Sequence, residues 1–202
     1  MSIVHLAQSD VIIRTDIFSK VSRIRWNHET SKEYLNQKEI ERIKKADFPE
    51  HPVFKRAVLF SIYTGLRRGD ILNLDWKDIC ICGEKSYMKI IIGKTKTPAI
   101  LPLSTTAISF LGKPKKSGPV FDGLGISTIH KLLPTLMRLA KITKHITFHI
   151  FRHSYAVIQI SLGTDIYTVS KMLTHKNVTT TQIYADLVNS KKRETANKIS
   201  LK

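Results

Sequence analysis

The hydrophobic period of the chain changes from helical to extended over one internal segment, residues 76–103. Short apolar runs there alternate with turn-forming residues and predict three strands, at 76–82, 87–92 and 99–103. Short turns at 83–85 and 93–96 separate these runs, and short turns join neighbouring antiparallel strands. The segment therefore predicts a small antiparallel sheet.

The sequence on both sides of this segment has the period of amphipathic helices. Asn36 and Glu39 have the spacing of a capping box, and a mostly apolar helix over 53–62 stops near Gly65, where glycine suits a left-handed cap. Further helices are predicted at 104–111, 127–140, 149–162, 166–173 and 179–188. We expect an α+β fold, mostly helical with a small three-stranded antiparallel sheet.

The charge of the chain restricts its partners. Its 33 Lys and Arg residues against 16 Asp and Glu residues give a net charge of +17, a field that attracts a polyanion. Nucleic acid is the leading partner, although an anionic membrane surface or a ribosome would accept the same field. No apolar run approaches the roughly 18 residues of a membrane span, and charged residues such as Asp10 and Arg14 interrupt the N-terminal apolar runs that a secretion signal would need. We expect a cytoplasmic protein.

The cysteine content excludes a fold held together by disulfides or by a structural zinc site. Cys80 and Cys82 are the two cysteines of the chain, too few for a disulfide framework or for the four ligands of a structural zinc site. We interpret both as packing residues on a strand.

Several polar residues have side chains that suit phosphate chemistry without a metal. Arginine holds two phosphate oxygens at once, lysine and histidine move protons, and tyrosine is a nucleophile. Each residue also has a structural interpretation: Arg67 could pair with Asp70, and Tyr184 could be a half-buried core residue. The candidates are Arg67, Asp70, Lys94, His149, Arg152, His175 and Tyr184.

These residues stand in four ordered blocks. The blocks are Thr64-Gly65-Leu66-Arg67 with Asp70, Gly93-Lys94 with Pro102-Leu103, His149-x-x-Arg152-His153-Ser154, and Leu173-Thr174-His175 leading to Thr181-x-x-Tyr184. In this order they resemble the catalytic domain of the tyrosine recombinase (phage integrase) family over residues 33–190. In two places the sequence departs from the family pattern. Thr174 stands where the family usually has glycine, which could tilt His175, and Asp70 replaces the more usual glutamate.

The resemblance implies a mechanism for DNA strand exchange. In it Tyr184 attacks a phosphodiester and forms a 3′-phosphotyrosine, which stores the bond energy, so no ATP is required. Positively charged side chains take the place of a metal cofactor. Arg67 and Arg152 neutralise the transition state, and His175 donates to a nonbridging oxygen. Lys94 protonates the leaving 5′-oxygen, with Lys96 as a second choice. His149 assists proton movement at Tyr184, and Asp70 orients neighbouring groups.

The resemblance also implies a domain organisation and partners. Residues 1–32 are expected to be a linker or the remnant of an N-terminal core-binding region, 33–190 the catalytic domain, and 191–202 a basic tail. The expected partner is double-stranded DNA. The chain is expected to be a monomer without DNA and a homotetramer on it, and to come from a bacterium or a phage. A type IB topoisomerase and a DNA-binding module without catalysis are the alternatives; the second is disfavoured because every reactive group is present.

Overall fold

The computed structural model describes residues 33–91, 98–185 and 188. The chain divides into two compact units, 1–32 and 33–202, and all described residues belong to the second. Its helices are α2 (Gln37–Lys45), α3 (Pro52–Thr64), α4 (Arg68–Leu72), α5 (Thr105–Ser109), α6 (Ile126–Leu139), α7 (Phe148–Ser161), α8 (Ile166–Met172) and α9 (Thr179–Ala185). The strands are β1 (Ile79–Cys80), β2 (Tyr87–Ile91) and β3 (Pro98–Pro102), and two 3-10 turns are η1 (Trp76–Asp78) and η2 (Gly83–Lys85).

The first two helices of this unit begin and end as their sequences predict. At the start of α2, the Asn36 side chain accepts from the Glu39 amide, and the Glu39 carboxylate accepts from the Asn36 amide, which completes the capping box. Helix α3 ends at Gly65, whose φ of +68° is left-handed. The chain therefore turns sharply after α3, and this turn places Arg67 at the start of α4.

The sheet is three-stranded and antiparallel, in the order β1-β2-β3. The predicted fold class is confirmed, but the first predicted strand is too long. The Asp75 side chain accepts from the Lys77 amide and caps a 3-10 turn at η1, so extended backbone is confined to Ile79 and Cys80. Strands β2 and β3 pair from Tyr87 opposite Pro102 to Ile91 opposite Pro98. The turn that joins them, with Lys94 and Lys96, lies outside the described residues.

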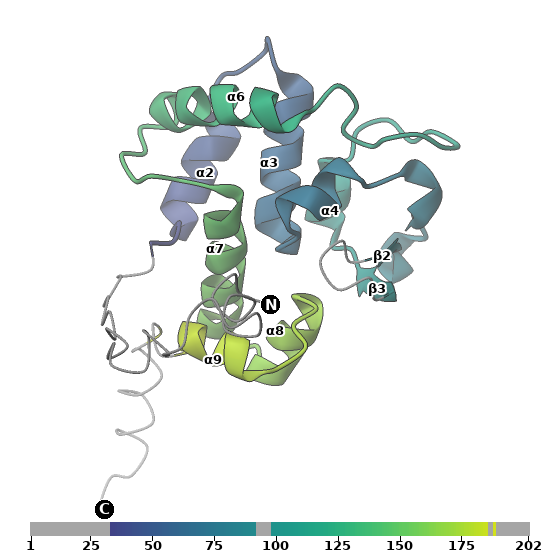
Figure 1. Cartoon of the computed structure of the whole chain (residues 1–202), viewed down its shortest axis with the longest axis vertical. Helices are drawn as coiled ribbons and strands as arrows, with labels where there is room; N and C mark the ends of the chain where they lie inside the picture. The colour runs from purple at the N-terminus through teal and green to yellow at the C-terminus, as the bar shows by residue number, and fades with distance from the viewer. Residues whose placement is uncertain (1–32, 92–97, 186–187, 189–202) are drawn as a thin grey trace, which may run out of the picture. The chain divides into compact units, whose positions relative to one another are not determined.

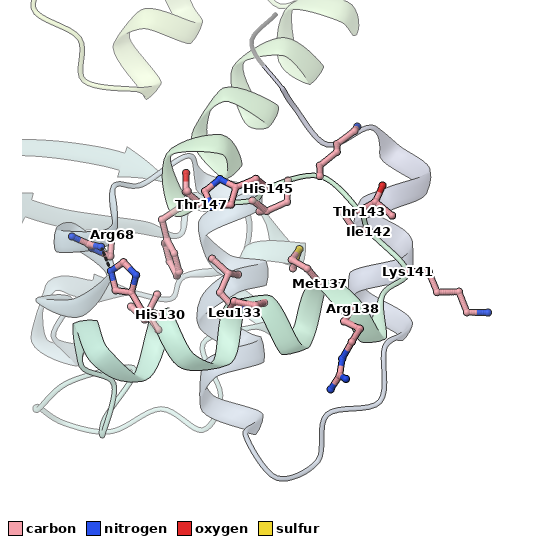
Figure 2. A pocket seen from close by; sticks show the side chains of 15 residues that line it. Arg68, His130, Leu133, Met137, Arg138, Lys141, Ile142, Thr143, His145 and Thr147 are labelled. Carbon is pink, nitrogen blue, oxygen red and sulfur yellow. Dashed lines mark hydrogen bonds between the residues drawn. The ribbon is translucent and has the colours of Figure 1, made fainter. Parts of the chain in front are cut away.

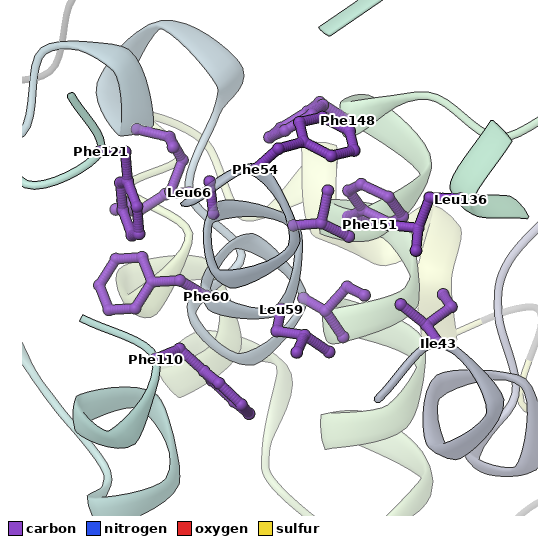
Figure 3. Close-up of a cluster of buried hydrophobic side chains, with 14 of the residues drawn as sticks. Ile43, Phe54, Leu59, Phe60, Leu66, Phe110, Phe121, Leu136, Phe148 and Phe151 are labelled. Atoms are coloured by element: carbon purple, nitrogen blue, oxygen red, sulfur yellow. The ribbon is translucent and has the colours of Figure 1, made fainter. Parts of the chain in front are cut away.

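Helix α3 is the centre of the main hydrophobic core. Figure 3 shows it with Phe110 and Phe121 on one side and Leu136 and Phe151 on the other, and α6 crosses α2 and α3 (Figure 1). Phe60 packs on Phe121 with ring centroids 5.5 Å apart. Each such buried side chain stabilises the fold by roughly 1.5–3 kcal/mol. This core fixes α7, which carries His149 and Arg152, and α3, which the turn to Arg67 follows.

A second, smaller cluster lies between α7, α8 and α9. Its buried members are Tyr155, Ala156, Val157, Ile160, Val169, Leu173, Tyr184 and Val188. Helices α8 and α9 pack on each other at the end of α7 (Figure 1). The cluster thus holds the segment of Tyr184 against the helix of Arg152. None of the helices in the described part of the chain is long and apolar enough to cross a membrane.

Candidate active site

Arg67 reaches from the turn after α3 toward the end of α8. It is the N-cap residue of α4, and its Nη1 atom donates to the Thr174 hydroxyl at 3.3 Å. The same Nη1 lies 4.0 Å from the buried Asp70 carboxylate, three residues further on. The contact with Asp70 that the sequence offered as a structural interpretation is therefore present. It holds the guanidinium near the site and leaves it partly exposed.

Arg152 joins three elements from a buried position on α7. Its side chain is 3% exposed; Nη1 donates to the Gly65 carbonyl at 2.7 Å, and Nη2 donates to the Leu173 carbonyl. Burial lowers its pKa to about 10, and the nearby charge of Arg67 adds to the effect. Since this value is well above neutrality, the guanidinium stays charged. It binds the end of α3 to the end of α8.

The turn that carries His175 is a Schellman cap with threonine in place of glycine. Thr174 has a φ of +55°, its amide donates to Lys171, and the His175 amide donates to Ser170. The left-handed position explains why the family usually has glycine here, because a side chain costs about 1–2 kcal/mol in that conformation. The cap is complete despite Thr174, so the substitution that could have tilted His175 leaves the turn of the backbone intact.

His175 is a neutral imidazole at physiological pH. Burial lowers its pKa to about 4, with further contributions from Arg152, Arg67 and two neighbouring histidines. Its Nδ1 atom lies 2.8 Å from the hydroxyl of buried Thr181. If Thr181 donates to Nδ1, the ring's single proton is on Nε2, where it is available to a phosphate oxygen.

His149, His153 and Tyr184 form a continuous series of ring contacts. His149 and His153, one turn apart on α7, have centroids 4.2 Å apart, and the His153 and Tyr184 centroids are 5.1 Å apart. Tyr184 is only 2% exposed. Burial raises the pKa of its phenol, while the charges of Arg152 and Arg67 oppose that rise. Any reaction of this hydroxyl therefore requires that it become accessible and that the arginines outweigh the effect of burial.

A basic pocket opens beside these residues. Its volume is about 350 Å³, and its lining includes Arg67, His149 and Arg152. A larger cavity of about 630 Å³ adjoins it and shares Arg68, Thr147 and Phe148 with it. Figure 2 shows Arg68 bonded to His130 at one end of the larger cavity and Arg138 and Lys141 toward the other. The smaller pocket contains the pair Arg67 and Arg152, and the larger cavity does not. Among the described residues, no group of His, Cys, Asp and Glu is arranged to hold a metal.

The structure brings most of the candidate residues together. Arg67, Asp70, His149, Arg152, His175 and Tyr184 lie in one charged cluster, linked by the contacts and pKa effects above. Lys94 and Lys96 lie outside the described residues. The sequence assigned no role to His153 or Thr181, although each stands inside a recognised block. Their spacing, one helical turn from His149 and from Tyr184, was the available signal.

Comparison with known proteins identifies the family. The phage integrase family matches residues 33–191, and the chain therefore belongs to it. A tyrosine recombinase of Thermosipho africanus is 30% identical over 72% of this chain and 53% of its own length. The XerA recombinase of Pyrococcus horikoshii is 28% identical over 72% of this chain and 55% of its own. The chain spans about half the length of these curated relatives.

Solved structures agree in fold. A crystal structure of XerA recombinase superposes with a TM-score of 0.67 at 26% identity, covering 84% of this chain and 66% of the other. The catalytic domain of bacteriophage HP1 integrase superposes with a TM-score of 0.63 at 22% identity, covering 83% of this chain and 94% of the other. The unit described here thus has the fold of an integrase catalytic domain.

Proposed function

We propose that this chain is the catalytic part of a site-specific DNA recombinase that cleaves and rejoins DNA through a 3′-phosphotyrosine. The observation that carries the proposal is the position of Arg152, a charged guanidinium on α7 that binds the Gly65 and Leu173 carbonyls. Its charge also opposes the rise that burial causes in the pKa of Tyr184. A lone buried arginine is expensive unless it is bonded and has a function. Here it lines the basic pocket and lies close enough to Tyr184 for its charge to act on the phenol.

In the proposed reaction, Tyr184 Oη attacks the phosphorus and the bond to the 5′-oxygen breaks. Arg67 and Arg152 neutralise the negative charge that develops on the nonbridging oxygens, and His175 Nε2–H donates to one of them. Lys94 gives a proton to the leaving 5′-oxygen. The phosphotyrosine conserves the energy of the phosphodiester, so a 5′-hydroxyl reverses the step and rejoins a strand.

The histidine series on α7 supplies a proton route in this proposal. His153, whose ring contacts that of Tyr184, takes the Tyr184 proton, and His149, in ring contact with His153, assists this transfer. Asp70 has no proton to move and orients Arg67. Thr181 fixes the tautomer of His175.

Double-stranded DNA is the partner we propose. The basic residues that line the larger cavity extend the positive surface away from the arginine pocket, which suits a phosphate backbone. Integrases of the same fold are described in complex with DNA, among them the XerH recombinase bound to its difH substrate and a lambda integrase dimer bound to a core site. We propose that the chain is monomeric when free and acts as a homotetramer on DNA, in the cytoplasm of a bacterium or an infected host.

The relatives named above are recombinases and do not favour the type IB topoisomerase or the DNA-binding module without catalysis. Covalent capture tests the proposal without knowledge of the target. Duplexes with a randomised core and a nick are incubated with the chain, and protein-linked strands are isolated under denaturing conditions and sequenced. We expect recurring sequences from the wild-type chain and none from Tyr184→Phe. Equal capture by the variant would refute the proposal. Relaxation of plasmids that lack the captured sequence would identify a topoisomerase instead.

A further inference from the structure

Cys80 and Cys82 place two sulfur atoms side by side at the surface. Cys80 is the last residue of β1, and Cys82 follows it at the usual strand interval for side chains on one face. Their Sγ atoms are 3.2 Å apart, Cys80 is half-buried and Cys82 is exposed. The prediction that both cysteines are packing residues is wrong for Cys82, whose thiol is open to solvent.

The backbone around Cys82 is held by its neighbours. The Cys82 amide donates to the Ser86 hydroxyl at 2.9 Å, and that hydroxyl donates to the Gly83 carbonyl at 2.7 Å. The Ser86 carbonyl accepts from the Leu103 amide at 2.9 Å, which ties the turn to the end of β3. The backbone next to the two sulfur atoms is therefore held by hydrogen bonds within the turn and to the end of β3.

We propose that Cys80 and Cys82 are a redox-active dithiol, which a small disulfide such as oxidised glutathione converts to an intrachain disulfide. One thiolate attacks the glutathione disulfide and releases one glutathione thiolate. The second thiolate then attacks the protein sulfur of the mixed disulfide and releases the other glutathione. Two thiols of the protein lose two electrons and two protons, and two molecules of reduced glutathione form.

The geometry requires little movement for this reaction. A disulfide bond is about 2.05 Å long and joins residues whose Cα atoms are about 4.4–6.8 Å apart. Two steps of fully extended chain span at most about 7 Å, so a modest bend at Ile81 suffices. No third His, Cys, Asp or Glu among the described residues joins the pair to form a metal site.

The two thiols act on each other. The hydrogen bond with Cys80, and then the charge of Cys80, raise the pKa of Cys82. When the sulfur of Cys80 is in a mixed disulfide, both effects are removed, which favours Cys82 as the resolving thiol.

The test uses the reduced full chain, incubated with oxidised glutathione and quenched in acid. We expect the intact mass to fall by two hydrogen atoms, uptake of N-ethylmaleimide to be lost, and the chain to remain monomeric on a non-reducing gel. Because the chain has two cysteines, an intrachain disulfide joins this pair. Cys82→Ser and Cys80→Ser should each retain one glutathione as a stable adduct, because neither has a resolving thiol.

Two results would overturn the proposal: a wild-type chain that keeps glutathione as stably as the single variants, or disulfide-linked dimers as the main product. Cys82 is exposed, so Cys82→Ser should fold normally even if Cys80→Ser does not. The readout does not involve DNA, and its failure would leave the proposed recombinase function untouched.

Discussion

Gly65→Ala tests the turn on which both arginines depend. Gly65 is left-handed, and its carbonyl accepts from Arg152. An added Cβ would lie 2.7 Å from Leu173 Cδ2 and 2.8 Å from Tyr155 Cδ1, closer than real contacts allow. The left-handed conformation costs about 1–2 kcal/mol with a side chain, and overpacking costs about 1–3 kcal/mol more. We expect the free energy of unfolding to fall by about 2–5 kcal/mol, a large share of a typical total.

Gly83→Ala is the matched control for this substitution. Gly83 is also left-handed, with a φ of +57°, but nothing lies within 4 Å of its added Cβ. It should therefore show the conformational cost of about 1–2 kcal/mol alone. Urea unfolding monitored by circular dichroism measures both variants. If Gly65→Ala is no more destabilising than Gly83→Ala, the packing of this turn on Leu173 and Tyr155 is wrong.

Three further predictions concern the proposed chemistry. Thr181→Val should slow adduct formation by up to ~10²–10³-fold, the cost of losing one oxyanion donor, whereas Thr181→Ser should not slow it. Covalent-adduct assays measure both rates. Equal rates for the two variants would refute the tautomer assignment. The pKa of His175 is lowered from 6.5 to about 4 in the native chain. Between these two pH values the imidazole is protonated in the unfolded chain but not in the native chain. The free energy of unfolding should therefore decrease as the pH falls from about 6.5 to about 4. Urea unfolding at about pH 7 and about pH 5 should show a smaller difference for His175→Gln, and an unchanged difference would contradict the assignment. Lys94→Ala should be rescued by a substrate with a 5′-bridging sulfur, a leaving group that needs no acid, and Lys96→Ala should need no rescue; the reverse pattern would move the acid to Lys96.

Local signals made much of the fold predictable. The capping box at Asn36 and the glycine after α3 act within a few residues, and both are observed as predicted. The first strand was overestimated because the Asp75 side chain caps a 3-10 turn, which apolar alternation does not reveal. Cys82 was assigned to packing because of its position in a predicted strand. The assignment failed because a side chain at the end of a strand is not necessarily buried.

The sequence predicted which residues would lie together, but it did not predict their environment. Order and spacing of the blocks identify Arg67, Arg152 and His175, but the burial of Arg152 and of Tyr184 depends on how α7, α8 and α9 pack. Long-range contacts of this kind leave no local pattern in the sequence. The left-handed φ of Thr174 was also not predictable from the sequence. Threonine rarely adopts this conformation, and here the Schellman cap imposes it.

The most direct measurement of the central claim is the identity of the protein–DNA bond. A captured duplex is nicked close to the cleavage position, so that the short released strand diffuses away and the adduct accumulates. Protease digestion and mass spectrometry then identify the linked residue, and end labelling identifies the free DNA end. We predict a single nucleotide-modified peptide linked through Tyr184 to a 3′-phosphate, with a free 5′-hydroxyl on the partner strand. A bond to another residue, or a link through a 5′-phosphate, would contradict the account.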